Sequence, residues 1–133
     1  MIQRGDQVLE VFIEETTDRL DSIESGLLHL ENCGTDCDPE IINSIFRDAH
    51  SVKAGSNLLK LTSVEELAHK LENVFEMIRK KEIDPSELII TACLESVDKL
   101  RELMENIERS ETISIRLHTH MLEVAVQKTL HGE

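Results

Sequence analysis

The chain has 133 residues, of which 27 are Asp or Glu and 14 are Lys or Arg, so its formal net charge is −13 with histidine neutral. This charge excludes proteins that bind the phosphate backbone of nucleic acids and proteins that dock on anionic lipid, because both classes depend on Lys and Arg. Hydrophobic residues make up 40% of the chain and aromatic residues 2%, which indicates a single folded domain over residues 1–133 and disfavours an all-β fold.

Apolar residues that recur at steps of three and four predict a series of amphipathic helices. The first covers about residues 6–33 and ends at Gly34, a residue that suits the end of a helix. The second covers about residues 39–59 and begins at Asp38-Pro39, where Asp suits the N-cap and Pro suits the first helical position.

The third predicted helix covers about residues 63–81, and Thr62-Ser63 offers two capping-box registers at its start. The fourth covers about residues 85–109 and follows a second Asp-Pro pair. Because the connections between these helices are short, sequential helices are expected to be antiparallel neighbours.

The segment that follows allows two interpretations. Residues 112–117 alternate between polar and apolar side chains, as in a short strand, whereas the apolar spacing further on favours a fifth helix over about residues 116–130. We predict the fifth helix. The fold class is therefore all-α: an antiparallel up-and-down helical bundle with a four-helix core and a fifth C-terminal helix.

Glycine and cysteine limit the kinds of site that the chain can contain. The five glycines are too widely spaced to form a phosphate-binding loop, so no complete ATP site is expected. No apolar signal segment follows Met1, and no apolar segment approaches the roughly 20 residues that span a membrane. Cys33, Cys37 and Cys93 are then expected to be free thiols in a reducing cytoplasm. A zinc half-site at the first two would lack a second Cys/His pair.

Two of the six histidines have neighbours that form a pattern. His50 precedes Lys53 by three residues and His69 precedes Glu72 by three, so each pair shares a helix face. In an antiparallel hairpin centred on Leu61, His50 lies opposite Glu72 and Lys53 lies opposite His69, because the members of each pair are equally distant from the turn. The other histidines are expected to be solvated: His29, His118, His120 and His131.

These four residues suggest a chemistry. A glutamate that accepts a hydrogen bond from Nδ1–H would fix the tautomer of His50 and leave Nε2 free as a nucleophile. Lys53 would stabilise an anion carried on Nε2. A phosphoryl group carried on His50 fits this arrangement. Two alternatives remain: a polar inter-helix cluster with no chemical role, and a metal or general-base enzyme that uses His50, His69 and Glu72.

The sequence around His50 is similar to a known motif. Residues 49–55 (AHSVKAG) resemble the A-H-S-x-K-G-G motif of histidine phosphotransfer (HPt) domains, in particular those of CheA-type chemotaxis kinases. Residues 69–73 (HKLEN) resemble the H-x-x-E-N segment of the same family at the matching distance. One departure is Ala54, which stands where the family usually has Gly and where a small residue lets a receiver domain approach.

The resemblance implies a phosphocarrier without ATPase activity of its own, part of a histidine protein kinase. His50 would be phosphorylated on Nε2 by a separate kinase domain that binds ATP and Mg, and would pass the phosphoryl group to an aspartate of a response regulator receiver domain. By position, Glu72 would orient His50, Lys53 would stabilise the phosphoryl group, and His69 would complete the hydrogen bonds. The domain itself would hold no cofactor and no metal.

The same resemblance leaves two other functions open. The acidic charge and the lack of a long apolar segment predict a cytoplasmic protein that neither binds nucleic acid nor inserts into a membrane. The alternatives are a stand-alone or hybrid-kinase phosphorelay module and a helical interaction module that is not phosphorylated. Arg47, Lys53 and Lys60 lie on the predicted helix that carries His50. They predict a basic rim around this histidine on an otherwise acidic surface.

Overall fold

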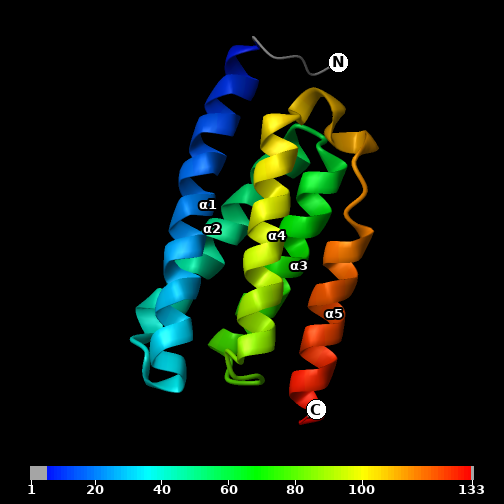
Figure 1. The fold of residues 1–133 in the computed structure, drawn as a ribbon. Coiled ribbons are helices and arrows are strands. Elements are labelled where there is room, and N and C mark those ends of the chain that lie inside the picture. Colours follow the sequence, from blue (N-terminus) through cyan, green and yellow to red (C-terminus); the bar gives the residue numbers. More distant parts are fainter. Residues whose placement is uncertain (1–5, 133) are drawn as a thin grey trace.

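Four long antiparallel helices form the core of the structure, a computed structural model that describes residues 6–132. They are α1 (Gln7–Cys33), α2 (Pro39–Leu58), α3 (Thr62–Arg79) and α4 (Glu87–Glu105). Figure 1 shows that consecutive helices run in opposite directions and that a fifth helix, α5 (Arg116–Leu130), lies beside the bundle, against α3 and α4. Two short 3₁₀ helices, η1 (Gly34–Asp36) and η2 (Ile107–Thr112), lie in the connections. The all-α fold class is confirmed, and residues 6–132 contain no strand.

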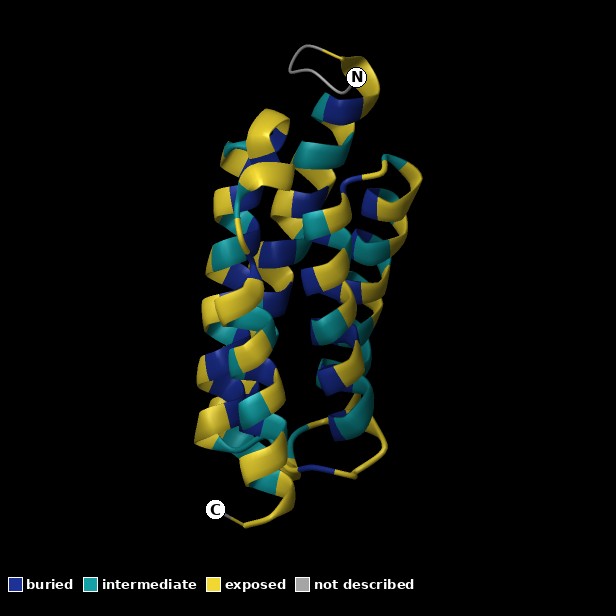
Figure 2. Ribbon diagram, turned by 90° about the vertical axis from the view of Figure 1, so that its right-hand side faces the viewer, coloured by how far each residue is buried: buried dark blue, intermediate teal, exposed yellow. Residues whose placement is uncertain are grey.

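One apolar core joins all five helices. Each helix turns its buried residues toward the interior and its exposed residues outward, as Figure 2 shows. Phe75 is the largest fully buried side chain. At Gly26, α1 approaches α2 so closely that a Cβ atom would overlap the side chain of Ile45. None of the helices in the described part of the chain is long and apolar enough to cross a membrane.

Most helix ends agree with the sequence pattern. The carboxylate of Asp38 accepts the N–H of Glu40 at 2.9 Å, with Pro39 in the first turn of α2. Gly34, with φ of 56°, ends α1. The fourth helix departs from the prediction, because the N-cap of α4 is Ser86 rather than a residue of the Asp-Pro pair. It also ends at Glu105, and the predicted last turn continues as η2 instead.

The start of α3 is capped from a distance. Neither predicted capping box forms: Leu61 is the N-cap, and no side chain of its own caps the helix. Instead Glu111 of η2 accepts the N–H groups of Thr62 and Ser63, at 2.6 and 3.3 Å. These groups lack partners within the helix, and a carboxylate favours the positive end of the helix dipole. Residues 107–112 therefore help to fix the first turn of α3.

Replacing Glu111 with Ala is expected to lower the free energy of unfolding by about 1 kcal/mol, the usual effect of losing an N-cap. Urea unfolding followed by circular dichroism measures this change. Glu14→Ala, at an exposed position on α1, is the control and should leave stability nearly unchanged. Equal effects of the two substitutions would contradict the capping role.

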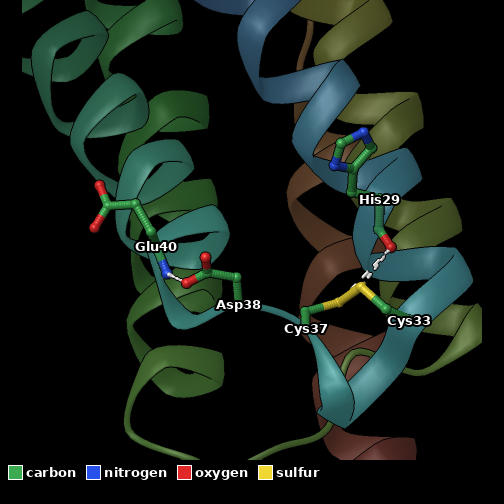
Figure 3. The surroundings of a disulfide bond; sticks show 5 residues. All are labelled: His29, Cys33, Cys37, Asp38 and Glu40. Carbon is green, nitrogen blue, oxygen red and sulfur yellow. Dashed lines mark hydrogen bonds between the residues drawn. A yellow bond between two sulfur atoms is a disulfide. The ribbon is translucent and has the colours of Figure 1, made fainter.

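The expectation of three free thiols is wrong for two of them. Cys33 ends α1 and Cys37 lies just before the N-cap of α2, and the two form a disulfide across η1 (Figure 3). The tight turn at Gly34 brings their Cα atoms to 5.1 Å, within the range of about 4.4–6.8 Å that a disulfide requires. Cys93 is free, and complete burial raises the pKa of its thiol to about 12, so this group stays protonated and unreactive.

Candidate functional site

A tight turn pairs α2 with α3 and so assembles the site. Lys60, at the turn, adopts a positive φ of 61°, and the N–H of Leu61 donates to the carbonyl of Ser56 at 2.8 Å. The buried Leu61 side chain anchors the turn in the core. The two helices then run antiparallel and in contact along their length, which places the middle of α2 opposite the middle of α3.

The predicted contact between His50 and Glu72 is present. Nδ1 of His50 hydrogen bonds to Oε2 of Glu72, and Nζ of Lys53 lies 2.6 Å from Oε1 of the same carboxylate. The His50 side chain is 56% exposed, whereas that of Glu72 is 9% exposed. Glu72 is therefore a buried carboxylate that holds an exposed imidazole with one oxygen and an ammonium group with the other.

Lys53 pairs with Glu72 and not with His69. Its flexible side chain reaches the carboxylate, because a buried carboxylate needs a cationic partner. His69 is exposed, and within residues 6–132 it forms no hydrogen bond or ion pair. The structure thus brings together three of the four predicted site residues, and the supporting role of His69 remains a prediction.

Electrostatics at the site fix the protonation of Glu72. Burial raises the pKa of this carboxyl, but the hydrogen bonds from Lys53 and His50 outweigh burial and hold the pKa below its ordinary value of 4.5. Glu72 is therefore ionised at neutral pH and can only accept hydrogen bonds. Nδ1 of His50 must carry the proton, and in the neutral imidazole Nε2 keeps its lone pair. No group among the described residues hydrogen bonds to Nε2, so this atom is available to react.

The lowered pKa predicts how stability depends on pH. Glu72 binds fewer protons in the folded state, so its contribution is complete above its unfolded-state pKa and is lost as the pH falls through the lower folded-state value. The wild type should therefore be more stable than Glu72→Gln at pH 7, and this difference should shrink below about pH 4.5. Thermal unfolding of both proteins between pH 7 and pH 3 measures it. A difference that stays constant with pH would contradict the pairing.

The predicted basic rim is largely neutralised by ion pairs. Arg47 pairs with Glu40 at 2.5 Å, and Lys53 pairs with Glu72. Lys60 is exposed at the turn. The cations near His50 therefore do not form an unpaired positive surface, because each of the first two has an acidic neighbour that the sequence pattern did not reveal.

Phe46 is a further residue beside the site, and the sequence analysis did not single it out. Its ring lies beside that of His50, with the centroids 6.4 Å apart and the planes inclined by 18°. The guanidinium of Arg79 on α3 lies 4.8 Å from the centroid of the Phe46 ring. The available signal was spacing, since Phe46 precedes His50 by four residues and so shares its helix face.

Fold and site together define a four-helix bundle in which the exposed His50 is held at Nδ1 by a buried carboxylate. The Hpt domain family matches residues 7–110. The chain belongs to this family, and it is homologous to the phosphotransfer domains of CheA proteins.

Individual relatives support this assignment. The chemotaxis protein CheA of Klebsiella aerogenes is 32% identical over 124 residues, which cover 93% of this chain and 19% of that protein. The CheA phosphotransferase domain from Thermotoga maritima is 30% identical, with a TM-score of 0.70 over 76% of this chain and 94% of that one. The phosphorylated P1 domain of CheA3 in complex with CheY6 from R. sphaeroides shares the fold, with 22% identity and a TM-score of 0.79 over 93% of this chain and 98% of that one. The chain spans between 11% and 19% of the length of the full CheA proteins that it matches.

Proposed function

We propose that His50 accepts a phosphoryl group on Nε2 from an ATP-binding kinase domain and passes it to an aspartate of a response regulator in chemotaxis signalling. One observation carries this proposal: an exposed imidazole has Nδ1 bound to a buried, ionised carboxylate, while Nε2 has no partner among the described residues. A histidine that served only to link two helices would gain nothing from an exposed, unpaired nitrogen.

The chemistry follows from this geometry. The lone pair of Nε2 attacks the γ-phosphorus of ATP, the bond from that phosphorus to the bridging oxygen breaks, and ADP leaves. The imidazole gains positive charge as the N–P bond forms, and the Glu72 carboxylate on Nδ1–H stabilises that charge. In the second step an aspartate oxygen attacks the same phosphorus, the N–P bond breaks, and His50 returns to its neutral form.

The partners are proposed from chemistry and from the relatives. The domain has no glycine-rich loop to bind ATP, so ATP and Mg belong on a separate kinase domain. The full CheA relatives are several times longer than this chain, and one related P1 domain is described in complex with CheY6. Ala54, one helical turn after His50, is small and exposed, which leaves room for a receiver to approach. We place the protein in the cytoplasm, together with the kinase and receiver domains with which it would exchange the phosphoryl group.

A relay assay tests the proposal. The domain is incubated with a CheA kinase core and labelled ATP, purified, and then mixed with a CheY-type receiver. We expect an acid-labile, alkali-stable phosphate on the domain, followed by loss of that label as the receiver gains it. A domain that gains no label, or that keeps its label in the presence of every receiver tried, would contradict a phosphocarrier role.

Replacing Lys53 with Met is expected to slow phosphorylation about tenfold or more, because the ammonium group near the acceptor is lost while the aliphatic stem keeps its packing. The rate of labelling by the kinase core measures this effect. Arg47→Met, on the exposed face of the same helix, is the matched control and should stay within about twofold of the wild type. Loss of the helical circular dichroism signal in Lys53→Met would instead make Lys53 a structural residue.

A further inference from the structure

We propose that Phe46 is a positioning residue that holds the plane of the His50 imidazole for phosphoryl transfer, and that Arg79 holds Phe46. This inference rests on the proposed function, since it concerns the same acceptor. It adds two residues to the site: Phe46 on α2, which contacts the imidazole, and Arg79 on α3, which contacts Phe46.

The His50 side chain needs a second restraint. It is 56% exposed, and its one hydrogen bond within residues 6–132 goes from Nδ1 to Glu72. A single hydrogen bond fixes one edge of a ring but leaves the ring free to tilt about that bond. The direction of the Nε2 lone pair depends on this tilt, and in-line attack on phosphorus requires it to be aimed correctly.

Phe46 supplies that restraint. The two rings are nearly parallel, with an angle of 18° between their planes and 6.4 Å between their centroids, within the range of offset aromatic pairs. Phe46 lies one turn before His50 on α2 and is itself partly buried against the core. A partly buried ring is a more rigid neighbour for the imidazole than solvent.

Phe46 is in turn held from α3. The guanidinium carbon of Arg79 lies 4.8 Å from the centroid of its ring, a cation–π distance. Arg79 is itself fixed by Glu76, whose two carboxylate oxygens accept from its Nη2 at 2.6 and 2.9 Å. The path from Glu76 through Arg79 and Phe46 thus reaches His50 by contacts independent of Glu72.

The first test is spectroscopic and needs no partner protein. Nitrogen-15 NMR of the imidazole reports which nitrogen carries the proton. In the wild type we expect the signature of protonated Nδ1 and unprotonated Nε2 for His50. In Phe46→Leu, which keeps an apolar side chain but removes the ring, a freely tilting imidazole should spend less time bonded to Glu72, so the two shifts should move toward each other. Phe46→Tyr, which keeps the ring, should restore the wild-type shifts.

The second test is kinetic. With the kinase core, Phe46→Leu should lower kcat for phosphorylation of the domain about threefold to tenfold, the range that one aromatic pair supports, and leave KM unchanged. The rate with phosphoramidate, a small phosphodonor, should fall by the same factor. A fall with the kinase alone would place Phe46 in the kinase interface, and unchanged rates and shifts would make it a core residue; either result overturns the positioning role.

Arg79→Met decides the question if Phe46→Leu fails to fold. Arg79 is exposed, so its loss should spare the bundle while releasing Phe46. We expect kcat to fall at least about twofold, with no change in Lys81→Met, the control at an exposed position two residues further along the chain. An unchanged kcat in Arg79→Met overturns the positioning role. A wild-type domain that gains no phosphate on His50 would instead refute the proposed function, so the two failures are distinguishable.

Discussion

The His50→Gln variant is expected to incorporate no acid-labile phosphate from the kinase core and ATP, against full labelling of the wild type. Glutamine offers no nucleophilic nitrogen, because its amide nitrogen shares its lone pair with the carbonyl. The side chain is 56% exposed, so the substitution leaves the core intact. Loss of label should therefore appear with an unchanged helical circular dichroism signal.

A second histidine provides the control for this experiment. His69 lies one turn before Glu72 on α3 and is exposed, so His69→Gln tests whether any nearby imidazole suffices. We expect His69→Gln to keep most of the label. Full labelling of His50→Gln, or complete loss of label in His69→Gln alone, would move the acceptor away from His50.

The Glu72→Ala variant is expected to be labelled about 10- to 100-fold more slowly than the wild type, by analogy with the loss of other groups that orient a histidine. Without the carboxylate, Nδ1–H loses its acceptor, the two tautomers of His50 mix, and the fraction with a free Nε2 lone pair falls. The positive charge that develops on the ring also loses its partner. Transfer onward to the receiver should slow less, because the phosphoryl group is then already on Nε2.

Stability has to be separated from reactivity in this variant. Removal of Glu72 also leaves Lys53 without its ion-pair partner, so some loss of stability is expected. Labelling should be measured well below the unfolding midpoint and compared with Glu66→Ala, an exposed position on α3. Wild-type rates for both labelling and onward transfer in Glu72→Ala would contradict the orienting role.

The sequence predicted the contact between His50 and Glu72 because it depends on two quantities that periodicity reveals. These are the helical face of each residue and its distance from the turn at Leu61. The helix ends at Asp38-Pro39 and Gly34 were also predicted, because they depend on the residue types at the ends themselves.

Features that depend on side-chain reach or on distant segments were not predicted. Lys53 pairs with Glu72, because a long side chain can move across a helix turn to meet a buried charge. Glu111 caps α3 from η2, and no local pattern connects these two segments. The disulfide between Cys33 and Cys37 depends on the shape of the loop between them, which spacing alone does not determine.

The site of phosphorylation on the ring is the most direct test of the account. Nitrogen-15 and phosphorus-31 NMR of the domain labelled by the kinase core distinguish a phosphate on Nε2 from one on Nδ1. Because Nδ1 of His50 is bound to Glu72, we predict a single species with phosphorus bonded to Nε2 of His50. Phosphorus on Nδ1, or on any other histidine of the chain, would contradict it.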